Sequence, residues 1–194
     1  MALIQQRQIV LKNSQSILIR NPQKRDAEQV LALAKAVLAE EVFNLSTLSE
    51  FTVGIQDEID WFNTYQAKPY SMILVAEHQD QVIGLLDFAN GHRQRIAHTG
   101  EMGISVAKAY RHLGIGSALL QTLIDWAAST SFIEKINLQV HATNVHAIKA
   151  YLKNGFRIEG VRKSELKYSE QEYVDSILMA YFVGADKKSR LKPE

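Results

Sequence analysis

The residues most suited to chemistry are Arg111, His112, Gly114, Gly116 and Ser117, which stand together in the run RHLGIGS. The first amide N–H groups of a helix have no partners within the helix, and they lie at the positive end of its dipole. Glycine at two of these positions removes the Cβ atoms that would hold a ligand away from the backbone. The arginine and the histidine add positive potential beside them. This combination predicts a binding site for phosphate groups.

The flanking residues must place this run between a strand and a helix. Before it, Met102, Ile104 and Val106 alternate with small residues, which is typical of a strand. After it, apolar residues recur at helical spacing: they are Leu119, Leu120, Leu123, Ile124 and Ala127. An ordinary tight turn would also explain a lone Gly-x-Gly. The basic pair just before the glycines, with no acidic residue over 113–118, favours the anion site.

Two common phosphate-binding motifs do not fit the run. A Walker A loop requires a lysine after its last glycine, but here Ser117 follows Gly116 directly. A dinucleotide fingerprint requires a third small residue at the position of Leu119. The run resembles instead the Arg/Gln-x-x-Gly-x-Gly/Ala signature of the GCN5-related N-acetyltransferase (GNAT) superfamily, with Arg111 and both glycines matching. In that superfamily the loop binds the pyrophosphate of acetyl-CoA, so the resemblance implies acetyl-CoA and no metal.

A second cluster lies in the stretch HATNVHAIKAYLKNGF. Asn144, Ala147, Tyr151, Gly155 and Phe156 match the second signature of the same superfamily, Asn-x-x-Ala-x-x-x-Tyr-x-x-x-Gly-Phe. The residues alone indicate a helix that Asn144 caps and Gly155 ends. On that basis alone, Tyr151 would be a core aromatic with a bonded hydroxyl. The resemblance implies that Asn144 contacts the pantetheine arm and that Tyr151 protonates the departing thiolate.

The resemblance also assigns cofactor contacts residue by residue: they are Ile104, Ser105, Val106, Arg111, His112, Leu113, Gly114, Ile115, Gly116, Ser117 and Asn144. Backbone N–H groups over 104–106 could stabilise the oxyanion of the reaction. An amine attacks a thioester only when neutral, and a free α-amino group has a pKa of about 8, so a base is needed. Glu101 is the candidate base. It could equally be a solvated strand residue or a partner of Arg111 or His98.

Bulk composition restricts the classes of partner. The 194 residues carry 22 Lys and Arg against 21 Asp and Glu, a net charge of 22 − 21 = +1, which disfavours nucleic-acid binding. The absence of cysteine excludes disulfides, thiol nucleophiles and cysteine metal sites. No apolar run approaches the roughly 18–20 residues that span a bilayer, and the first residues are polar too early for a signal peptide. We expect a cytoplasmic protein with no membrane or nucleic-acid partner.

The periodicities predict an α/β fold built on one mixed sheet. The expected elements are strands at 9–11 and 17–20, a helix from 24, an irregular stretch with part of a helix over 40–52, a helix at 57–65, a hairpin of 71–77 and 81–88, a strand at 96–106, a helix to 128, a strand at 135–140, a helix at 144–154 and a hairpin of 156–167 and 172–183. The resemblance implies a mostly antiparallel sheet with flanking helices, splayed between the strands 96–106 and 135–140. Residues 1–15 are predicted to form an N-terminal extension or extra strand, 16–183 the N-acetyltransferase domain and 184–194 a charged tail.

The leading interpretation is an acetyl-CoA-dependent N-acetyltransferase, an enzyme of the acyltransferase class. Transfer would be direct, because no cysteine could carry the acetyl group. The acceptor would be a primary amine of a small molecule or of a peptide or protein N-terminus. The alternative is a non-catalytic module that senses CoA or regulates a partner. A homodimer is compatible with the resemblance, since members often pair through sheet edges or helices.

The last part of the chain narrows the resemblance. The matching residues, which point to the branch with ribosomal-protein and small-amine N-acetyltransferases, are Glu159, Gly160, Arg162, Tyr173, Asp175 and Met179. Tyr173 and Asp175 would lie beside the acceptor or stabilise their hairpin. Acidic residues over 40–62 and 164–173 would attract a cationic amine, although solvated helix and loop faces are the simpler explanation.

Overall fold

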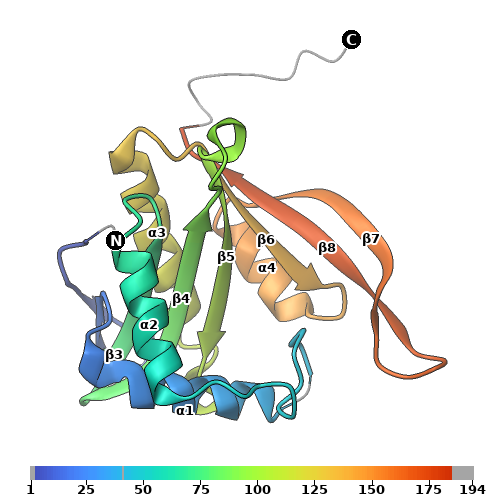
Figure 1. The fold of residues 1–194 in the computed structure, drawn as a ribbon, viewed down its shortest axis with the longest axis horizontal. Helices are drawn as coiled ribbons and strands as arrows, with labels where there is room; N and C mark the ends of the chain where they lie inside the picture. The colour runs from blue at the N-terminus through green and yellow to red at the C-terminus, as the bar shows by residue number, and fades with distance from the viewer. Residues whose placement is uncertain (1–2, 41, 185–194) are drawn as a thin grey trace.

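A computed structural model describes residues 3–40 and 42–184. Its eight strands form one sheet in the order β1-β2-β3-β4-β5-β6-β8-β7 (Figure 1). The strands are β1 (Arg7–Val10), β2 (Ser16–Arg20), β3 (Met72–His78), β4 (Gln81–Asn90), β5 (Thr99–Val106), β6 (Lys135–His141), β7 (Arg157–Lys167) and β8 (Tyr173–Phe182). The α-helices are α1 (Ala27–Leu38), α2 (Ile55–Gln66), α3 (Ile115–Thr130) and α4 (Val145–Lys153). The mixed α/β sheet predicted from the sequence is therefore confirmed.

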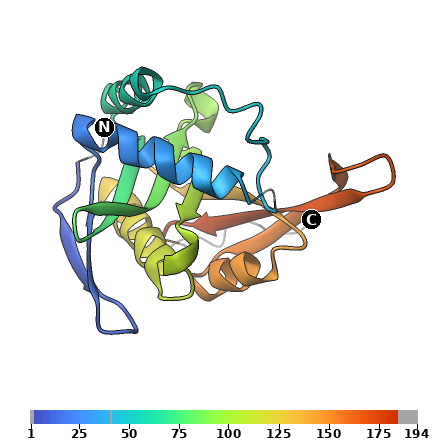
Figure 2. The same cartoon turned by 90° about the horizontal axis from the view of Figure 1, so that it is seen from below.

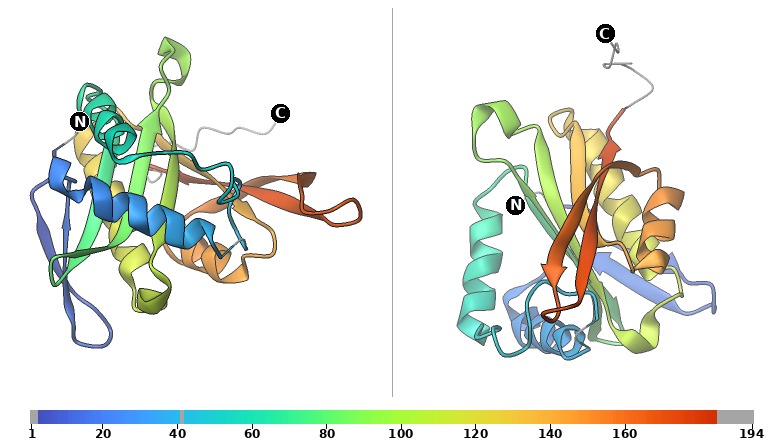
Figure 3. Two further views of the ribbon diagram at one scale, coloured as in Figure 1. Left: turned by 60° about the horizontal axis from the view of Figure 1, so that its bottom comes forward. Right: turned by 90° about the vertical axis from the view of Figure 1, so that its right-hand side faces the viewer.

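Helices cover both faces of the sheet, as Figures 2 and 3 show. α1 and α2 lie on one face, where Val30, Leu33 and Phe62 pack on Ile73 and Val75 of β3. α3 and α4 lie on the other face, and their buried residues join the larger apolar cluster, which includes Leu86, Phe88, Leu119, Leu123, Ile136 and Tyr151. β3 and β4 carry apolar side chains on both faces, whereas β5 and β6 turn apolar residues toward α3 and α4 and mostly polar residues toward the other face.

The sheet opens between its two central strands. β5 and β6 are the parallel pair, and they pair only from Thr99 with Lys135 to Glu101 with Asn137. Beyond these residues β5 continues to Val106 along β4, while β6 continues to His141 along β8. The remaining strand pairs are antiparallel. The splay predicted between 96–106 and 135–140 is thus present.

A buried ion cluster joins the first strands to α1. The Arg20 guanidinium donates to both carboxylate oxygens of Asp26, at 2.7 and 2.9 Å, and also to Glu77. Asp26 in turn accepts the Gln23 amide N–H at 2.6 Å. These bonds fasten the start of α1 to β2 and β3. They satisfy the charges that burial would otherwise penalise.

Two sequence predictions about element bounds are wrong. The strand expected from Ile96 begins at Thr99, because the residues before it form a short 3₁₀ turn over Gln94–Ile96 that the Thr99 hydroxyl closes by donating to the Ile96 carbonyl. The part of a helix expected within 40–52 is absent from the described residues 42–52. There the backbone closes only short turns, with the Glu50 N–H donating to the Thr47 carbonyl at 3.2 Å and the Phe51 N–H to the Leu48 carbonyl at 3.3 Å.

Other elements match within a few residues at their ends. α3 runs on to Thr130, past the break expected at Ser129. Residues 7–10 of the predicted N-terminal extension form the edge strand β1. Most of the predicted tail, 185–194, lies outside the described residues. Within the described ranges, no helix is both long enough and apolar enough to cross a bilayer.

Candidate active site

The turn from β5 into α3 presents free backbone donors. Gly114 caps α3 in the left-handed region, with φ 100° and ψ 0°, which favours glycine. The first i to i−4 bond of the helix runs from the Ala118 N–H to the Gly114 carbonyl, so the N–H groups of residues 115–117 precede the ladder. The first turn of α3 contains no acidic residue. The arrangement can accept an anion at the helix start.

Space above these donors is open. A Cβ atom added at Gly114 would meet nothing within 4 Å, and one at Gly116 would meet only Ile104 Cδ1, at 3.8 Å. Packing within the protein therefore does not demand the second glycine. By contrast, Ile115 is 1% exposed and Leu113 packs against the same apolar cluster. Their side chains belong to the core, so the backbone is what this turn offers to a ligand.

The two basic residues before the turn are placed differently. Arg111 donates from Nε to the Val106 carbonyl at 3.0 Å, and its two terminal nitrogens donate to Glu40 at 2.8 and 2.6 Å. These bonds lower the pKa of the Glu40 carboxyl, chiefly through the hydrogen bonds from Arg111. His112 is exposed, with a φ of 64° and its ring 5.2 Å from that of His146. Sequence reasoning found no acidic neighbour because Glu40 comes from the end of α1.

Helix α4 carries the second signature and is fastened to the turn. The Asn144 side chain accepts the Ala147 N–H at 3.1 Å, which confirms Asn144 as the N-cap, and Gly155 follows the helix with a φ of 89°. At the other end, Asn154 Nδ2 donates to the Ser117 hydroxyl at 3.2 Å. The capping bond uses only the oxygen of the Asn144 amide. Its nitrogen is left available to a ligand.

Tyr151 projects from α4 into the apolar cluster. It is 8% exposed, and its ring lies 5.7 Å from that of Phe156. Burial raises the pKa of the Tyr151 phenol to about 12, so it stays protonated at neutral pH. The hydroxyl makes no hydrogen bond with the described residues, in contrast to the bonded core tyrosine that the residues alone predicted. A fixed ring with a free O–H donor is suited to act on a ligand.

The edge of β5 that faces the splay has no strand partner beyond Glu101. Ile104 and Val106 pack toward the α3 layer, and Ser105 alternates to the opposite face. Backbone N–H groups on this edge can therefore face a ligand lying between β5 and β6. The predicted cofactor residues thus converge on one region, from the splay to the start of α3.

Polar groups gather on the α1 and α2 side of the splay. Glu101 is exposed there, in register with Ala89 of β4 and Asn137 of β6. No ion pair among the described residues involves Glu101, so the predicted partnership with Arg111 is not formed. The Asn137 Oδ1 atom is buried without a hydrogen-bond partner. These groups are available to an incoming acceptor.

Sequence reasoning missed Asp87, which lies on the same face one row farther along. It accepts a hydrogen bond from the Tyr65 hydroxyl at 3.1 Å and is in register with Gly103. Burial raises the pKa of Asp87 to about 6, and the bond from Tyr65 opposes that rise. One signal could have found it: Asp87 is the single charged residue inside the otherwise apolar run VIGLLDF.

Two distant segments meet over the end of β6. The Tyr168 hydroxyl lies 2.9 Å from His141 Nδ1 and donates to the Val42 carbonyl at 3.1 Å, while the Phe43 ring meets His141 edge-on. His141 is 5% exposed, burial lowers its pKa, and its Nε2 has no partner. The β7–β8 hairpin thereby touches the segment that follows α1. Nothing in the sequence analysis indicates this contact.

Several residues expected to meet the acceptor have internal partners instead. Asp57 accepts the Gly54 N–H at the start of α2, and Glu165 pairs with Arg162 at 3.1 Å. Asp175 binds Lys163 and the Ser164 N–H, at 2.7 and 2.8 Å. On the opposite strand of the hairpin, Lys167 lies over the ring of Tyr173. Asp175 and Tyr173 therefore stabilise the hairpin, and much of the predicted acidic rim is internally paired.

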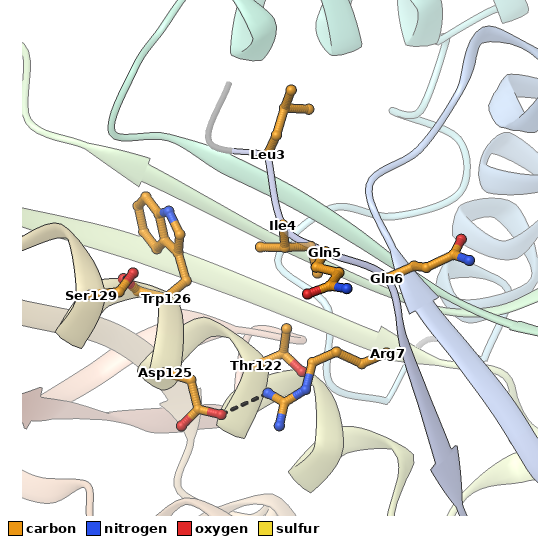
Figure 4. A pocket seen from close by; sticks show the side chains of 9 residues that line it. All are labelled: Leu3, Ile4, Gln5, Gln6, Arg7, Thr122, Asp125, Trp126 and Ser129. Atoms are coloured by element: carbon orange, nitrogen blue, oxygen red, sulfur yellow. Dashed lines mark hydrogen bonds and ion pairs between the residues drawn. The ribbon is translucent and has the colours of Figure 1, made fainter.

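A separate hollow lies beneath the N-terminal segment (Figure 4). Residues 3–7 line it together with the last turns of α3, where Arg7 pairs with Asp125 at 2.6 Å. This hollow is at the opposite end of α3 from Gly114. Within the described ranges, no group of three or more His, Asp or Glu side chains could hold a metal ion.

Comparison with known proteins identifies relatives in sequence and in structure. The sequence profile of the acetyltransferase (GNAT) family matches residues 39–156. The chain is 31% identical to the L-amino acid N-acetyltransferase AaaT of Escherichia coli K12 over 166 residues, which are 84% of this chain and 96% of that protein. A GNAT-family acetyltransferase from Streptococcus pneumoniae superposes with a TM-score of 0.82 at 26% identity, covering 87% of this chain and 99% of that one.

One solved neighbour contains the ligand that the sequence resemblance implies. The phosphinothricin acetyltransferase of Sinorhizobium meliloti, in complex with acetyl-CoA, superposes with a TM-score of 0.76 at 18% identity. The superposition covers 96% of this chain and 94% of that one. At this identity the likeness is one of fold.

Proposed function

Because the chain belongs to the acetyltransferase (GNAT) family and is therefore an acyltransferase, we propose that it transfers acetyl from acetyl-CoA to the primary amine of a small amino compound. A free L-amino acid is the favoured acceptor, since AaaT, the relative at 31% identity, is named for that activity. The contact that bridges Tyr168 and Val42 also favours a small acceptor. A protein N-terminus would need this side of the site to be open.

The observation that carries the proposal is the joint placement of the splay, the glycine turn and Tyr151. Free N–H groups and open space at residues 114–117 suit the pyrophosphate of acetyl-CoA. The unpaired amide nitrogen of Asn144 suits the pantetheine arm. The pantetheine arm would then lie between β5 and β6, with the thioester near Ile104 and the Tyr151 hydroxyl on the sulfur side.

The transfer itself forms one bond and breaks one. The amine nitrogen attacks the thioester carbonyl, the C–N bond forms, the C–S bond breaks, the nitrogen loses a proton and the sulfur gains one. We assign the sulfur's proton to the Tyr151 hydroxyl, and backbone N–H groups of 104–106 to the oxyanion. Glu101, exposed on β5, is assigned to carry the amine's proton toward solvent. No cysteine is present to take the acetyl group, so transfer is direct.

Calorimetry and turnover test the proposal in sequence. Acetyl-CoA, CoA and ATP are titrated into the purified chain, and acetyl-CoA and CoA should bind while ATP does not. Thiol release is then followed with L-amino acids, a polyamine and a short peptide with a free N-terminus. Turnover should be highest with an L-amino acid. Absence of CoA binding would refute the proposal. Binding of CoA without turnover on any amine would also refute it, and would favour a CoA-sensing module.

A further inference from the structure

Asp87 reaches across the sheet toward the splay. It projects from β4, opposite Gly103 of β5. A Cβ atom added at Gly103 would lie only 2.7 Å from Asp87 Oδ1. The carboxyl group therefore extends over the backbone of β5, into the space that any other residue at position 103 would fill. The pairing of β5 with β6 has ended by this row, so the edge of β5 at Gly103, beneath the carboxyl, borders the open splay.

A hydrogen bond from α2 holds the carboxyl in this position. The Tyr65 hydroxyl donates to Asp87 Oδ2 at 3.1 Å, and Trp61 packs edge-on against Tyr65 and hydrogen-bonds it. Apart from the Tyr65 bond and one from the Asp87 amide N–H, no hydrogen bond to the carboxylate comes from the described residues, and no other side chain bonds Oδ1. One carboxylate oxygen is thus fixed by the protein, and the other, over Gly103, is available to a donor from outside.

Among the described residues, no cation forms an ion pair with Asp87, and the nearby Lys68 ammonium lies over the Tyr65 ring, 5.6 Å from its centroid. α2 contributes Tyr65 and, two turns earlier on the same face, the buried Glu58. β5 contributes Glu101, and β3 contributes only the apolar Ile73. The buried face of α1 is apolar. A carboxylate with this environment and a raised pKa lacks the ion pair of a structural aspartate, and it suits proton transfer near neutral pH.

We propose that Asp87 is the catalytic residue that takes the proton from the acceptor amine. Tyr65 orients its carboxyl group, and the missing side chain at Gly103 leaves space for it. This inference rests on the proposed function and deepens it. The ammonium N–H transfers its proton to Asp87 Oδ1, leaving a neutral amine and a carboxylic acid. Glu101, diagonal to Asp87 on the same face, passes that proton to solvent and restores the carboxylate. The neutral amine attacks the thioester, the C–S bond breaks as Tyr151 protonates the sulfur, and the second proton lost by the nitrogen restores the Tyr151 hydroxyl.

Two substitutions test the role, each with a matched control. Asp87→Asn should lower kcat/KM for the amine roughly 10²-fold, the loss expected for a general base, while the Kd for acetyl-CoA stays unchanged. Asp125→Asn, at the far end of α3, should match wild type. Gly103→Ala leaves Asp87 in place but displaces its carboxyl, and should lower kcat/KM roughly 10- to 10²-fold. Gly160→Ala, where a Cβ meets nothing within 4 Å, is the control.

The double variant separates this role from general damage. If both changes act on the same carboxyl, Gly103→Ala added to Asp87→Asn should cause no further loss. Independent, additive losses would overturn the proposal. So would an Asp87→Asn enzyme within twofold of wild type. Wild-type protein that acetylates no amine would overturn the proposed function as well, which keeps the two failures distinguishable.

The pH dependence supplies a readout that a structural role would not move. The pH profile of kcat/KM is measured with two amines of different pKa. A rise in kcat/KM at the same pH with both amines reports a group of the enzyme, and this limb is expected near pH 6. Tyr65→Phe removes a donor to the carboxylate, so the pKa of Asp87 and this limb should move to higher pH. Tyr70→Phe should leave the limb in place.

The same pKa can be followed without turnover. Carbon NMR of protein labelled at the aspartate carboxyls should show a signal titrating near pH 6 that is absent from Asp87→Asn. The signal should titrate at higher pH in Tyr65→Phe. A limb or signal that Tyr65→Phe leaves unmoved would overturn the proposed orientation by Tyr65.

Discussion

Two buried aspartates on the same layer of the molecule have opposite electrostatic environments. Burial alone would raise the pKa of both. At Asp26, hydrogen bonds from Arg20 and from the Gln23 amide outweigh burial, and the pKa falls below its usual value. At Asp87, burial outweighs the hydrogen bonds from Tyr65 and from the Asp87 amide, and the pKa rises to about 6. The difference lies in the partners, because residue type and layer are shared.

The contrast extends to the neighbours of each aspartate. The carboxylates and guanidinium of the Arg20 cluster bond one another, as expected for groups whose role is to hold elements together. On the α1 and α2 side of the splay, by contrast, three buried polar atoms have no hydrogen-bond partner: Asn137 Oδ1, His141 Nε2 and Glu58 Oε2. Unsatisfied buried atoms cost stability. Their concentration on this side of the sheet indicates a region shaped for a ligand, whereas the Arg20 cluster serves the fold.

Removing the unpaired Tyr151 hydroxyl from the site should give the largest effect, and it should change the rate of transfer without changing stability or cofactor affinity. Tyr151→Phe should lower kcat by roughly 10²–10⁴, as for loss of a general acid. The thermal midpoint and the acetyl-CoA Kd should hardly change, because the hydroxyl bonds no described residue. Steady-state kinetics and calorimetry measure both. A wild-type kcat would remove Tyr151 from the mechanism.

Breaking the Arg20 cluster should lower stability and leave the activity of the folded protein unchanged, the opposite of the Tyr151 substitution. Arg20→Met leaves Asp26 and Glu77 without their cation, which should lower the free energy of unfolding by about 3–5 kcal/mol. Activity per folded molecule should be kept. Urea denaturation with parallel kinetics checks this. An equal loss of kcat in the folded fraction would mean that the two regions are not separable.

The pH dependence of stability should distinguish the aspartates by sign. A raised folded pKa means that wild-type stability falls as pH rises from about 4 through about 6. The stability of Asp87→Asn relative to wild type should therefore increase over that window, by about 3 kcal/mol. A lowered folded pKa means stability is lost as pH falls below about 4. Asp26→Asn should therefore lose ground to wild type as pH rises toward 5. Thermal midpoints across pH test both, and equal signs would contradict the contrast.

The smallest effect is expected at the Glu40–Arg111 ion pair, which lies beside the glycine turn. Glu40 holds Arg111 in an ion pair that is partly exposed, with side chains 21% and 34% accessible. Glu40→Gln should cost at most about 1 kcal/mol of stability. It also removes a negative charge near the glycine turn, so the Kd for acetyl-CoA should fall a few-fold, and less at high salt. A weaker affinity would instead show that Glu40 positions Arg111 for the ligand.

Much of the fold could be read from contiguous residues, because helix ends and strand alternation depend on near neighbours. A few residues on each side predict that Asn144 caps its helix and that Gly155 ends it, and the structure has both. The prediction was wrong where a helix and isolated turns were both compatible with the local sequence. The stretch around Thr47 closes only short turns where part of a helix was expected.

The sequence by itself determined the family, the order of elements, the glycine turn and the helix that carries Tyr151. These depend on short-range backbone preferences and on two spaced motifs. Only the tertiary structure decided which polar side chains are paired. Arg111 meets Glu40 across 71 residues of chain, and Asp87 lies over Gly103 because the register of β4 and β5 sets them opposite. A side chain's partner is fixed by chain closure and strand register, which near neighbours in sequence do not encode.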